Sequence, residues 1–228
     1  MKTEGVIAIL EQTGAIVTGS HFVYTNKEHG EERHGETYID VRTLHTLVEE
    51  TSLLYDEIAQ RFLTDDVEAV VAPETAGIIT GHVIASHLSF SSSTKVVEVT
   101  ARKETVRIPD PEGRGRRCYA ETGGFAFRHR DARLLAGRRV LVVDGVLNTG
   151  GSILKVVRLL EGLGCTIVGV GVIWNRRGAI LLPTTFLGVP KFFALVNQGI
   201  REWTASQCAL TGPCAWGRPI NKELGQGT

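Results

Sequence analysis

Residues 139–152 constrain the fold of this chain more than any other segment. The apolar, mostly β-branched run from Val140 to Val143 is typical of a buried strand, and it ends at Asp144. A loop at 149–152 then leads into a helical pattern at 153–160. Its glycines let the backbone approach a ligand closely, and the helix start offers unpaired N–H groups. The segment therefore predicts an anion-binding turn, with Asp144 available for sugar hydroxyls or Mg2+.

Hydrophobic periodicity along the rest of the chain predicts alternating strands and helices. We expect a helix near 4–12, strands at 21–25 and 36–40, a long helix at 42–63, strand 67–72 with helix 76–87, strand 96–99, strand 139–144 with helix 151–163, and strand 166–174. Such a repeat is typical of an α/β fold with a parallel sheet covered on both faces. Ligands of these sheets bind beyond the carboxyl ends of the strands.

The run 139–152 resembles the signature of the type I phosphoribosyltransferases that binds 5-phosphoribosyl 1-diphosphate (PRPP). In that signature two acidic residues follow the strand, and here Gly145 replaces the second, which leaves one of two carboxylates for the ribose diol. The resemblance implies that Asp144 holds the diol and Mg2+, whereas a Gly-rich turn alone also occurs in unrelated doubly wound sheets. The residues implied for the 5-phosphate are Asn148, Thr149, Gly150, Gly151 and Ser152.

The family resemblance also implies an architecture. We expect an α/β type I phosphoribosyltransferase-like core with a central, mostly parallel sheet flanked by helices, a small N-terminal hood or hairpin, and a flexible loop. The turn after strand 67–72 resembles the family's diphosphate-binding loop, although it also reads as an ordinary helix start. Its residues are Pro73, Glu74, Thr75, Ala76 and Gly77.

Residues 102–104, Arg-Lys-Glu, resemble the entrance to the catalytic loop of orotate phosphoribosyltransferases. The resemblance implies that Arg102 and Lys103 reach the leaving diphosphate, partly across a dimer interface. Cations preorganised around that charge in a closed site would stabilise it. The charged, turn-rich stretch 103–124 is predicted to be a long loop, acting as a lid or binding loop or simply solvated.

Two further segments resemble base-binding parts of the orotate-type enzymes. The hairpin 21–40 offers Phe22, Tyr24 and Tyr38 for stacking on a base, or for packing within the hairpin, and Lys27 in its connection. Strand 166–174 ends in a sequence similar to Asp-Arg-x-x-Gly, in which Arg176 would bind a carboxylate in bidentate fashion and Asn175 replaces the acid. An Arg at a strand end is also a common surface feature.

Charge and length exclude several functional classes. The 228 residues fit one phosphoribosyltransferase domain, with an N-terminal helix and substrate-side hairpin at 1–41, a core at 42–200 and a tail at 201–228. Lys plus Arg equals Asp plus Glu at 25 each, which argues against nucleic-acid and lipid partners. There is no signal-peptide pattern and no long apolar run, so we expect a cytoplasmic protein, and the resemblance implies a homodimer.

The four cysteines lack the paired spacing of a zinc site, and we expect them to be reduced. Cys165 is predicted to be a core residue. Cys208 and Cys214 could share a metal or a disulfide, but the tail 208–221 is assigned a structural role, because it resembles the C-terminal tail of some orotate-type proteins.

Together these features predict an enzyme that transfers 5-phosphoribose from PRPP to a nitrogenous base, orotate or a related one, with Mg2+ as cofactor and diphosphate as product. Two alternatives stay open. The missing acid at Gly145 is compatible with a degenerate protein that binds PRPP or a nucleotide without turnover, and Asn175 with a transferase for another acceptor.

Overall fold

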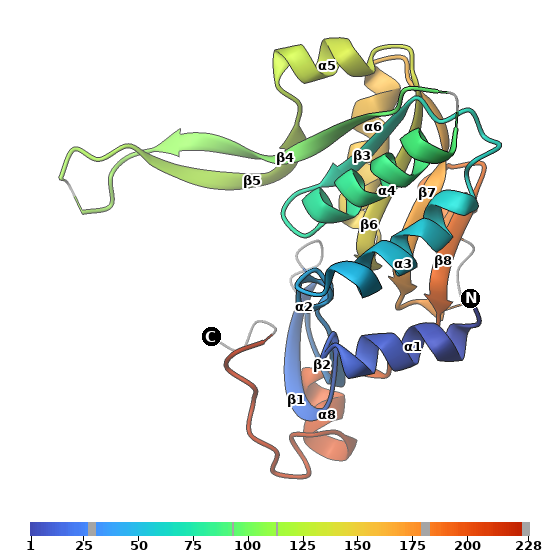
Figure 1. Cartoon of the computed structure of the whole chain (residues 1–228). Coiled ribbons are helices and arrows are strands. Elements are labelled where there is room, and N and C mark those ends of the chain that lie inside the picture. Colours follow the sequence, from blue (N-terminus) through green and yellow to red (C-terminus); the bar gives the residue numbers. More distant parts are fainter. Residues whose placement is uncertain (27–30, 93, 113, 179–182, 225–228) are drawn as a thin grey trace.

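The computed structural model describes residues 1–26, 31–92, 94–112, 114–178 and 183–224. A six-stranded sheet in the order β5-β4-β3-β6-β7-β8 forms its centre (Figure 1). Its strands are β3 (Ala69–Pro73), β4 (Val97–Ile108), β5 (Cys118–Ala126), β6 (Arg139–Leu147), β7 (Thr166–Asn175) and β8 (Phe192–Asn197). All neighbours run parallel except β4 and β5, which confirms the predicted α/β class with a mostly parallel sheet.

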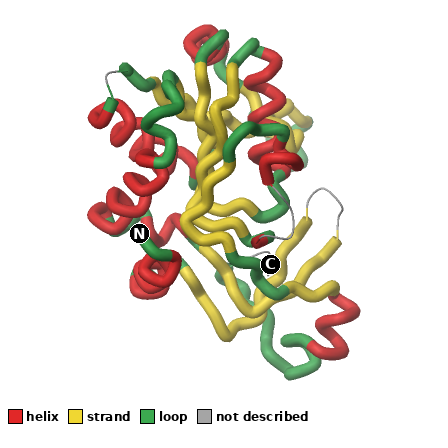
Figure 2. Tube along the Cα trace, turned by 90° about the vertical axis from the view of Figure 1, so that its right-hand side faces the viewer, coloured by secondary structure: helices red, strands yellow, loops and turns green. Residues whose placement is uncertain are grey.

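Helices cover both faces of this sheet because alternate strand residues point to opposite sides. Val70 and Leu141 pack into the core on one face, and Val71 and Val142 into the core on the other. The first face is covered by α1 (Thr3–Gln12), α3 (Val48–Gln60) and α4 (Gly77–Ser91), and the second by α5 (His129–Leu135), α6 (Gly151–Gly162) and α7 (Pro183–Leu187). Figure 2 shows the sheet edge-on between the two layers.

A second, three-stranded antiparallel sheet joins the two ends of the chain (Figure 1). It contains β1 (Ile16–Asn26), β2 (Glu31–Ile39) and β9 (Glu202–Thr204), in that order, and β9 leads directly into α8 (Ala205–Thr211). The tail then returns to β1, where the Asn221 amide donates to the His21 carbonyl at 2.7 Å. The predicted N-terminal hairpin is therefore part of a larger unit that includes C-terminal residues.

Two predicted elements differ from the structure. The long helix expected at 42–63 is divided into α2 (Val41–Leu44) and α3, because the Leu44 carbonyl accepts from the Leu47 amide and from the Thr51 hydroxyl. The long loop expected at 103–124 consists largely of paired strands: β4 and β5 form an antiparallel ribbon that projects from the sheet (Figure 1). Its residues are mostly exposed, so its sequence lacks the apolar alternation of a half-buried strand.

Within the described segments, no helix has both the length and the apolar character needed to cross a membrane.

Candidate functional site

A cavity of about 900 Å³ opens at the carboxyl ends of the parallel strands. Its wall combines the junction of β2 and α2, the base of the β4–β5 ribbon, the end of β6 and the start of α6. The lining residues are Tyr38, Ile39, Asp40, Val41, Arg42, Ala76, Lys103, Glu121, Thr122, Gly123, Gly124, Phe125, Asp144, Val146, Leu147, Asn148, Thr149, Gly150, Gly151, Ser152, Ile153 and Lys155. The cavity lies where the strand order predicts a ligand site.

The loop between β6 and α6 lies along this cavity, and all five residues at 148–152 line it. Gly150 has a left-handed backbone conformation with φ of 87°, and a Cβ there would lie 2.6 Å from the Phe186 ring, so the loop requires glycine. The Arg177 guanidinium donates to the Thr149 carbonyl at 3.0 Å and lies over the Phe186 ring. These contacts join the loop to the turn after β7 and to α7.

Asp144 is half-buried in the cavity wall, in the second half of β6. One of its oxygens accepts from the Gly145 amide at 2.7 Å. Burial raises the pKa of Asp144 to about 7, since desolvation disfavours the charged carboxylate. Within the described part of the chain no basic side chain forms an ion pair with it, so a bound cation would favour its charged form.

Gly145 faces the opposite way from Asp144 along β6 and is buried. A Cβ at this position would overlap the Cγ2 methyl of Val41 and lie 3.2 Å from the Val41 Cβ. Val41 is itself buried, with 4% of its surface exposed. The space that the second acidic side chain of the resembled signature would need is therefore filled by valine.

The predicted diphosphate loop at 73–77 forms the turn between β3 and α4. The Glu74 carboxylate accepts from the Lys103 amide at 2.5 Å, which ties this turn to the base of the ribbon. Ala76 lines the cavity, and the buried Gly77 begins the helix. The turn thus borders the cavity, although most of its side chains point elsewhere.

Lys103 and Arg102 point to opposite sides of the ribbon. Lys103 lines the cavity and forms an ion pair with Glu121 at 2.8 Å. Arg102 is exposed and is not part of the cavity wall. Successive residues of a strand alternate in direction, so only one of the two predicted cations faces this cavity within a single chain.

Arg176 contacts the cavity wall through a hydrogen bond to Asn148. Its guanidinium donates to Asn148 at 2.8 Å and to Glu202 at 2.7 Å, and it stacks over Tyr24 at 4.4 Å. The side chain is 9% exposed, and among the described residues its Nε has no hydrogen-bond partner. Arg176 itself is not in the cavity wall, whereas Asn148 is. The alternative that Arg176 is an ordinary surface residue was wrong, because its side chain is only 9% exposed and its guanidinium contacts Asn148, Glu202 and Tyr24.

Asn175, which replaces the acid of the resembled pattern, is fully buried. Its amide nitrogen donates to the Gly178 carbonyl at 3.0 Å and to Asn197 at 2.6 Å, and its amide oxygen accepts from the Arg177 backbone at 3.1 Å. A carboxylate could not supply the two donated hydrogen bonds. Asn175 therefore stabilises the turn after β7.

The four hairpin residues predicted to bind a base have different positions, and the Tyr24 ring is the one covered by the Arg176 guanidinium. Tyr38 lines the cavity. Phe22 is fully buried and packs against Tyr38 with ring centroids 5.5 Å apart, so no face of Phe22 is open to a base, and packing within the hairpin is its role. Lys27 lies outside the described residues.

Several charged residues of the wall were missed by the sequence analysis. Asp40 accepts from both guanidinium nitrogens Nε and Nη2 of Arg42, at 2.8 and 2.7 Å, and this pair holds down the pKa of Asp40. Lys155 donates to the Gly123 carbonyl at 3.1 Å and so joins α6 to the ribbon. The position of Lys155, one turn into the helix behind the glycine loop, was the available signal for it.

A family model and several known proteins match this chain. The family model for a phosphoribosyl transferase domain matches residues 40–187. Orotate phosphoribosyltransferase of Thermotoga maritima is 28% identical over 220 residues, which cover 96% of this chain and 97% of that protein.

Two solved structures share the fold. The crystal structure of orotate phosphoribosyltransferase from Aeropyrum pernix superimposes with a TM-score of 0.56 at 23% identity, covering 84% of this chain and 92% of that one. Adenine phosphoribosyltransferase from Thermoanaerobacter pseudethanolicus gives a TM-score of 0.53 at 22% identity, covering 71% of this chain and 88% of that one. Proteins named for different bases thus have this fold, and the fold alone does not identify an acceptor.

Proposed function

The chain belongs to the phosphoribosyl transferase domain family, and on this premise we propose that it transfers 5-phosphoribose from PRPP to orotate or a closely related base and releases diphosphate. The relatives named orotate phosphoribosyltransferase support this acceptor, because their similarity extends over nearly the whole chain. It therefore includes the N-terminal hairpin and the C-terminal tail, which lie outside the matched family model.

One observation carries the proposal: the glycine loop 148–152 and Asp144 line the same cavity. In this proposal the loop binds the 5-phosphate at the start of α6, where backbone N–H groups and the helix dipole favour an anion. Asp144, which β6 residues 145–147 separate from the loop, accepts hydrogen bonds from the ribose diol. Lys103, across the cavity, takes the leaving diphosphate when that anion displaces Glu121 from it.

Asp144 is also suited to be a ligand of the Mg2+ expected of this family. Mg2+ prefers oxygen ligands and is held in many enzymes by one or two carboxylates together with substrate phosphates. Among the carboxylates of the wall, Asp40 forms an ion pair with Arg42 and Glu121 with Lys103. Asp144 forms no ion pair among the described residues, and burial raises its pKa. When bound, Mg2+ would neutralise charge on the diphosphate.

The transfer needs positioning and electrostatics and no nucleophilic side chain. The C1–O bond to diphosphate breaks with its electron pair going to the leaving oxygen, and a ring nitrogen of the base forms the new bond to C1. The base reacts with this ring nitrogen deprotonated, its proton having gone to solvent, so the nitrogen's own electron pair makes the new bond. Holding both reactants rigidly, with a cation at the leaving group, lowers the barrier.

The acceptor side of the proposal rests on Arg176. Its guanidinium Nη1 donates to Asn148, which lines the cavity. In this proposal the carboxylate of the base lies beside Tyr38, displaces Asn148 and accepts from the Arg176 guanidinium. Because Asn175 has a structural role beside it, the missing acid at 175 gives no support to a different acceptor.

The test is turnover on a panel of bases with Mg-PRPP, measured as diphosphate release. We expect orotate to be used, and uracil, adenine and hypoxanthine to react far more slowly. Asp144→Asn should abolish turnover, whereas Asp131→Asn, on α5 outside the cavity, should not. The acceptor assignment would be contradicted if a base without a carboxylate were turned over efficiently while orotate were not turned over at all.

The second candidate is a protein that binds PRPP without turnover. The observation that favours it is the replacement of the second acidic side chain by Gly145, with Val41 in its place. Calorimetric titration with Mg-PRPP separates the two cases, because binding without diphosphate release on any base would support this candidate and refute the enzyme.

A homodimer is part of the proposal, because the exposed Arg102 points away from its own cavity and is free to approach that of a second chain. Light scattering on the purified protein would give the mass. A monomer at micromolar concentration would contradict this arrangement.

A further inference from the structure

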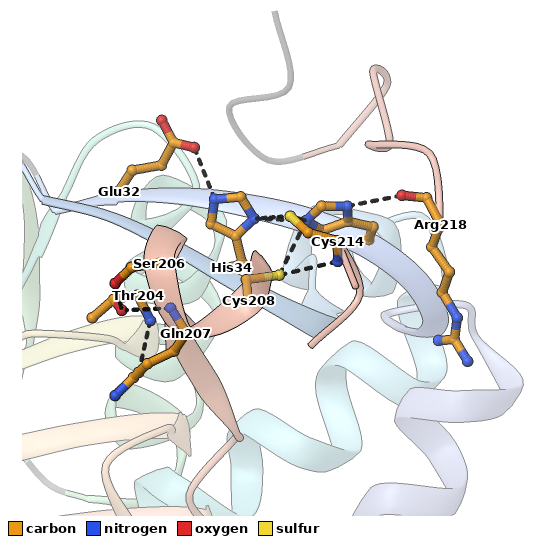
Figure 3. A network of polar contacts seen from close by, with 9 residues as sticks. Glu32, His34, Thr204, Ser206, Gln207, Cys208, Cys214 and Arg218 are labelled. Atoms are coloured by element: carbon orange, nitrogen blue, oxygen red, sulfur yellow. Dashed lines mark hydrogen bonds and ion pairs between the residues drawn. The ribbon is translucent and has the colours of Figure 1, made fainter. Parts of the chain in front are cut away.

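Four side chains with metal-binding atoms meet between the N-terminal hairpin and the C-terminal tail. They are His21 on β1, His34 on β2, Cys208 on α8 and Cys214 just beyond it, and one ligand atom from each lies within 4.8 Å of the other three. His21, His34 and Cys208 are buried, with at most 4% of their surfaces exposed. Figure 3 shows His34, Cys208 and Cys214 converging. The cluster is separate from the cavity described above.

The histidines are oriented as metal ligands usually are. His21 Nδ1 lies 3.1 Å from the Arg218 carbonyl, and His34 Nε2 lies 2.8 Å from the Glu32 carboxylate. Both partners can only accept, so both outer ring nitrogens carry the proton. Metal-binding histidines are typically held in this way by a carbonyl or a carboxylate, which leaves the other nitrogen for the metal.

The inner nitrogens of the two rings then face each other with lone pairs. His21 Nε2 and His34 Nδ1 are 2.7 Å apart, the distance of a hydrogen bond. Two neutral rings with protonated outer nitrogens have no proton for such a bond, and their lone pairs would repel. A cation between them removes this conflict, whether it is an added proton or a metal ion.

The thiols favour a metal ion. Cys208 Sγ lies 3.9 Å from His21 Nε2, and Cys214 Sγ lies 3.8 Å from that nitrogen and 3.5 Å from His34 Nδ1. Ligands of tetrahedral zinc with bonds of 2.0–2.3 Å are roughly 3.3–3.8 Å apart, so these three sulfur–nitrogen distances lie in or within about 0.1 Å of that range. The two nitrogens must move apart, and all four ligand atoms already lie within 4.8 Å of one another.

The backbone around the thiols supports thiolate ligands. The Cys214 amide donates to Cys208 Sγ at 3.2 Å, which stabilises negative charge on that sulfur. Gly212 makes the tight return possible, because a Cβ there would lie 2.9 Å from the Cys208 Cα and 3.0 Å from its sulfur. The turn is thus shaped to bring both sulfurs to the histidine pair.

We propose that His21, His34, Cys208 and Cys214 bind one Zn2+ in a closed, structural site. Two thiolates and two imidazoles form a soft donor set that suits zinc and excludes Mg2+ or Ca2+. With four protein ligands, no position is open for a substrate. Cys208 and His21 are 187 residues apart in sequence, so the ion would join the C-terminal tail to the N-terminal hairpin.

Metal content of the purified full-length protein tests this proposal without any substrate, so its outcome is independent of the proposed enzymatic activity. We expect about one zinc per chain by atomic spectrometry, as in four-ligand structural sites. After exchange with Co2+, intense visible d–d bands and a sulfur-to-cobalt charge-transfer band should appear, because these mark tetrahedral coordination with thiolates.

Variants identify the ligands. Cys214→Ser should lose the zinc and the cobalt bands, and Cys214→His, which restores a ligand atom, should regain them in part. Cys118→Ser is the matched control, because Cys118 lies on β5 outside the cluster and should not affect metal content. Absence of tetrahedral cobalt bands from the wild-type protein would overturn the proposal, as would full zinc content in Cys214→Ser. A Cys208–Cys214 disulfide in freshly isolated protein would also overturn it. If Cys214→Ser does not fold, the wild-type cobalt spectrum still decides.

Discussion

Restoring the acidic residue that Gly145 replaces should destabilise the protein, because Val41 fills the space beside it. In Gly145→Asp, the new Cβ would overlap the Cγ2 methyl of Val41 and lie 3.2 Å from the Val41 Cβ and Cγ1, closer than the ~3.5–4.0 Å of an ordinary carbon–carbon contact. Forcing atoms into such a packed site typically costs about 1–3 kcal/mol. A buried carboxylate without a partner adds to this cost.

We therefore expect Gly145→Asp to lower the free energy of unfolding by about 3 kcal/mol, measured by urea denaturation at neutral pH. In a chain of this size, that loss corresponds to roughly 6–12 °C in melting temperature. Gly145→Ala adds the Cβ without the charge, so it should cause only part of this loss in the free energy of unfolding. Gly162→Asp is the matched control, because an added Cβ at the exposed Gly162 meets nothing within 4 Å.

A double variant tests the contact itself. Val41→Ala removes the overlapping methyl groups, so Gly145→Asp should cost at least ~1 kcal/mol less in that background than in the wild type. The reasoning would be refuted if Gly145→Asp kept wild-type stability and bound Mg-PRPP more tightly. That result would mean that a side chain at 145 turns into the cavity and joins Asp144 on the ribose diol.

Three further predictions concern other residues. Because the pKa of Asp144 is raised to about 7, it gains a proton as the pH falls, so Mg-PRPP affinity measured by calorimetry should weaken on acidification. From pH 8 to pH 6 the ionised fraction falls roughly tenfold, and Asp144→Asn should remove this component; equal pH profiles for the two proteins would contradict it. Asn175→Asp should lower the unfolding free energy by about 2–3 kcal/mol, because a carboxylate would face two hydrogen-bond acceptors, and an unchanged urea midpoint would count against that network. Arg176→Lys should raise KM for orotate at least about tenfold in steady-state assays, because lysine lacks the planar fork, and an unchanged KM would remove Arg176 from the acceptor site.

The core strands and the glycine loop were predicted well because their signals are local. A continuous apolar run such as 140–143 has few alternatives to a strand buried on both faces, and the structure buries all four residues. Gly150 needs a backbone conformation that other residues rarely adopt, and this requirement is also local. Parallel strands then bring their carboxyl ends to one edge, so the cavity could be located from the order of elements.

The ribbon and the helix break could not be predicted because nothing local specifies them. The ribbon's outer residues are exposed on both faces, so strand pairing leaves no apolar alternation in the sequence. The break between α2 and α3 depends on Thr51 capping the Leu44 carbonyl, in a stretch whose apolar periodicity continues through it. The sequence left base stacking and hairpin packing both open for Phe22, because an aromatic residue has the same sequence signal in a core and in a site.

By itself, the sequence determined the α/β alternation, the parallel sheet and the glycine-rich turn after β6, since each depends on residues that are neighbours along the chain. The tertiary structure alone decided which side chains meet across it. It set Val41 against Gly145, directed Lys103 and Arg102 to opposite sides, and brought His21 and His34 to Cys208 and Cys214. Periodicity and spacing describe a residue's own element, whereas such contacts depend on how distant elements pack together.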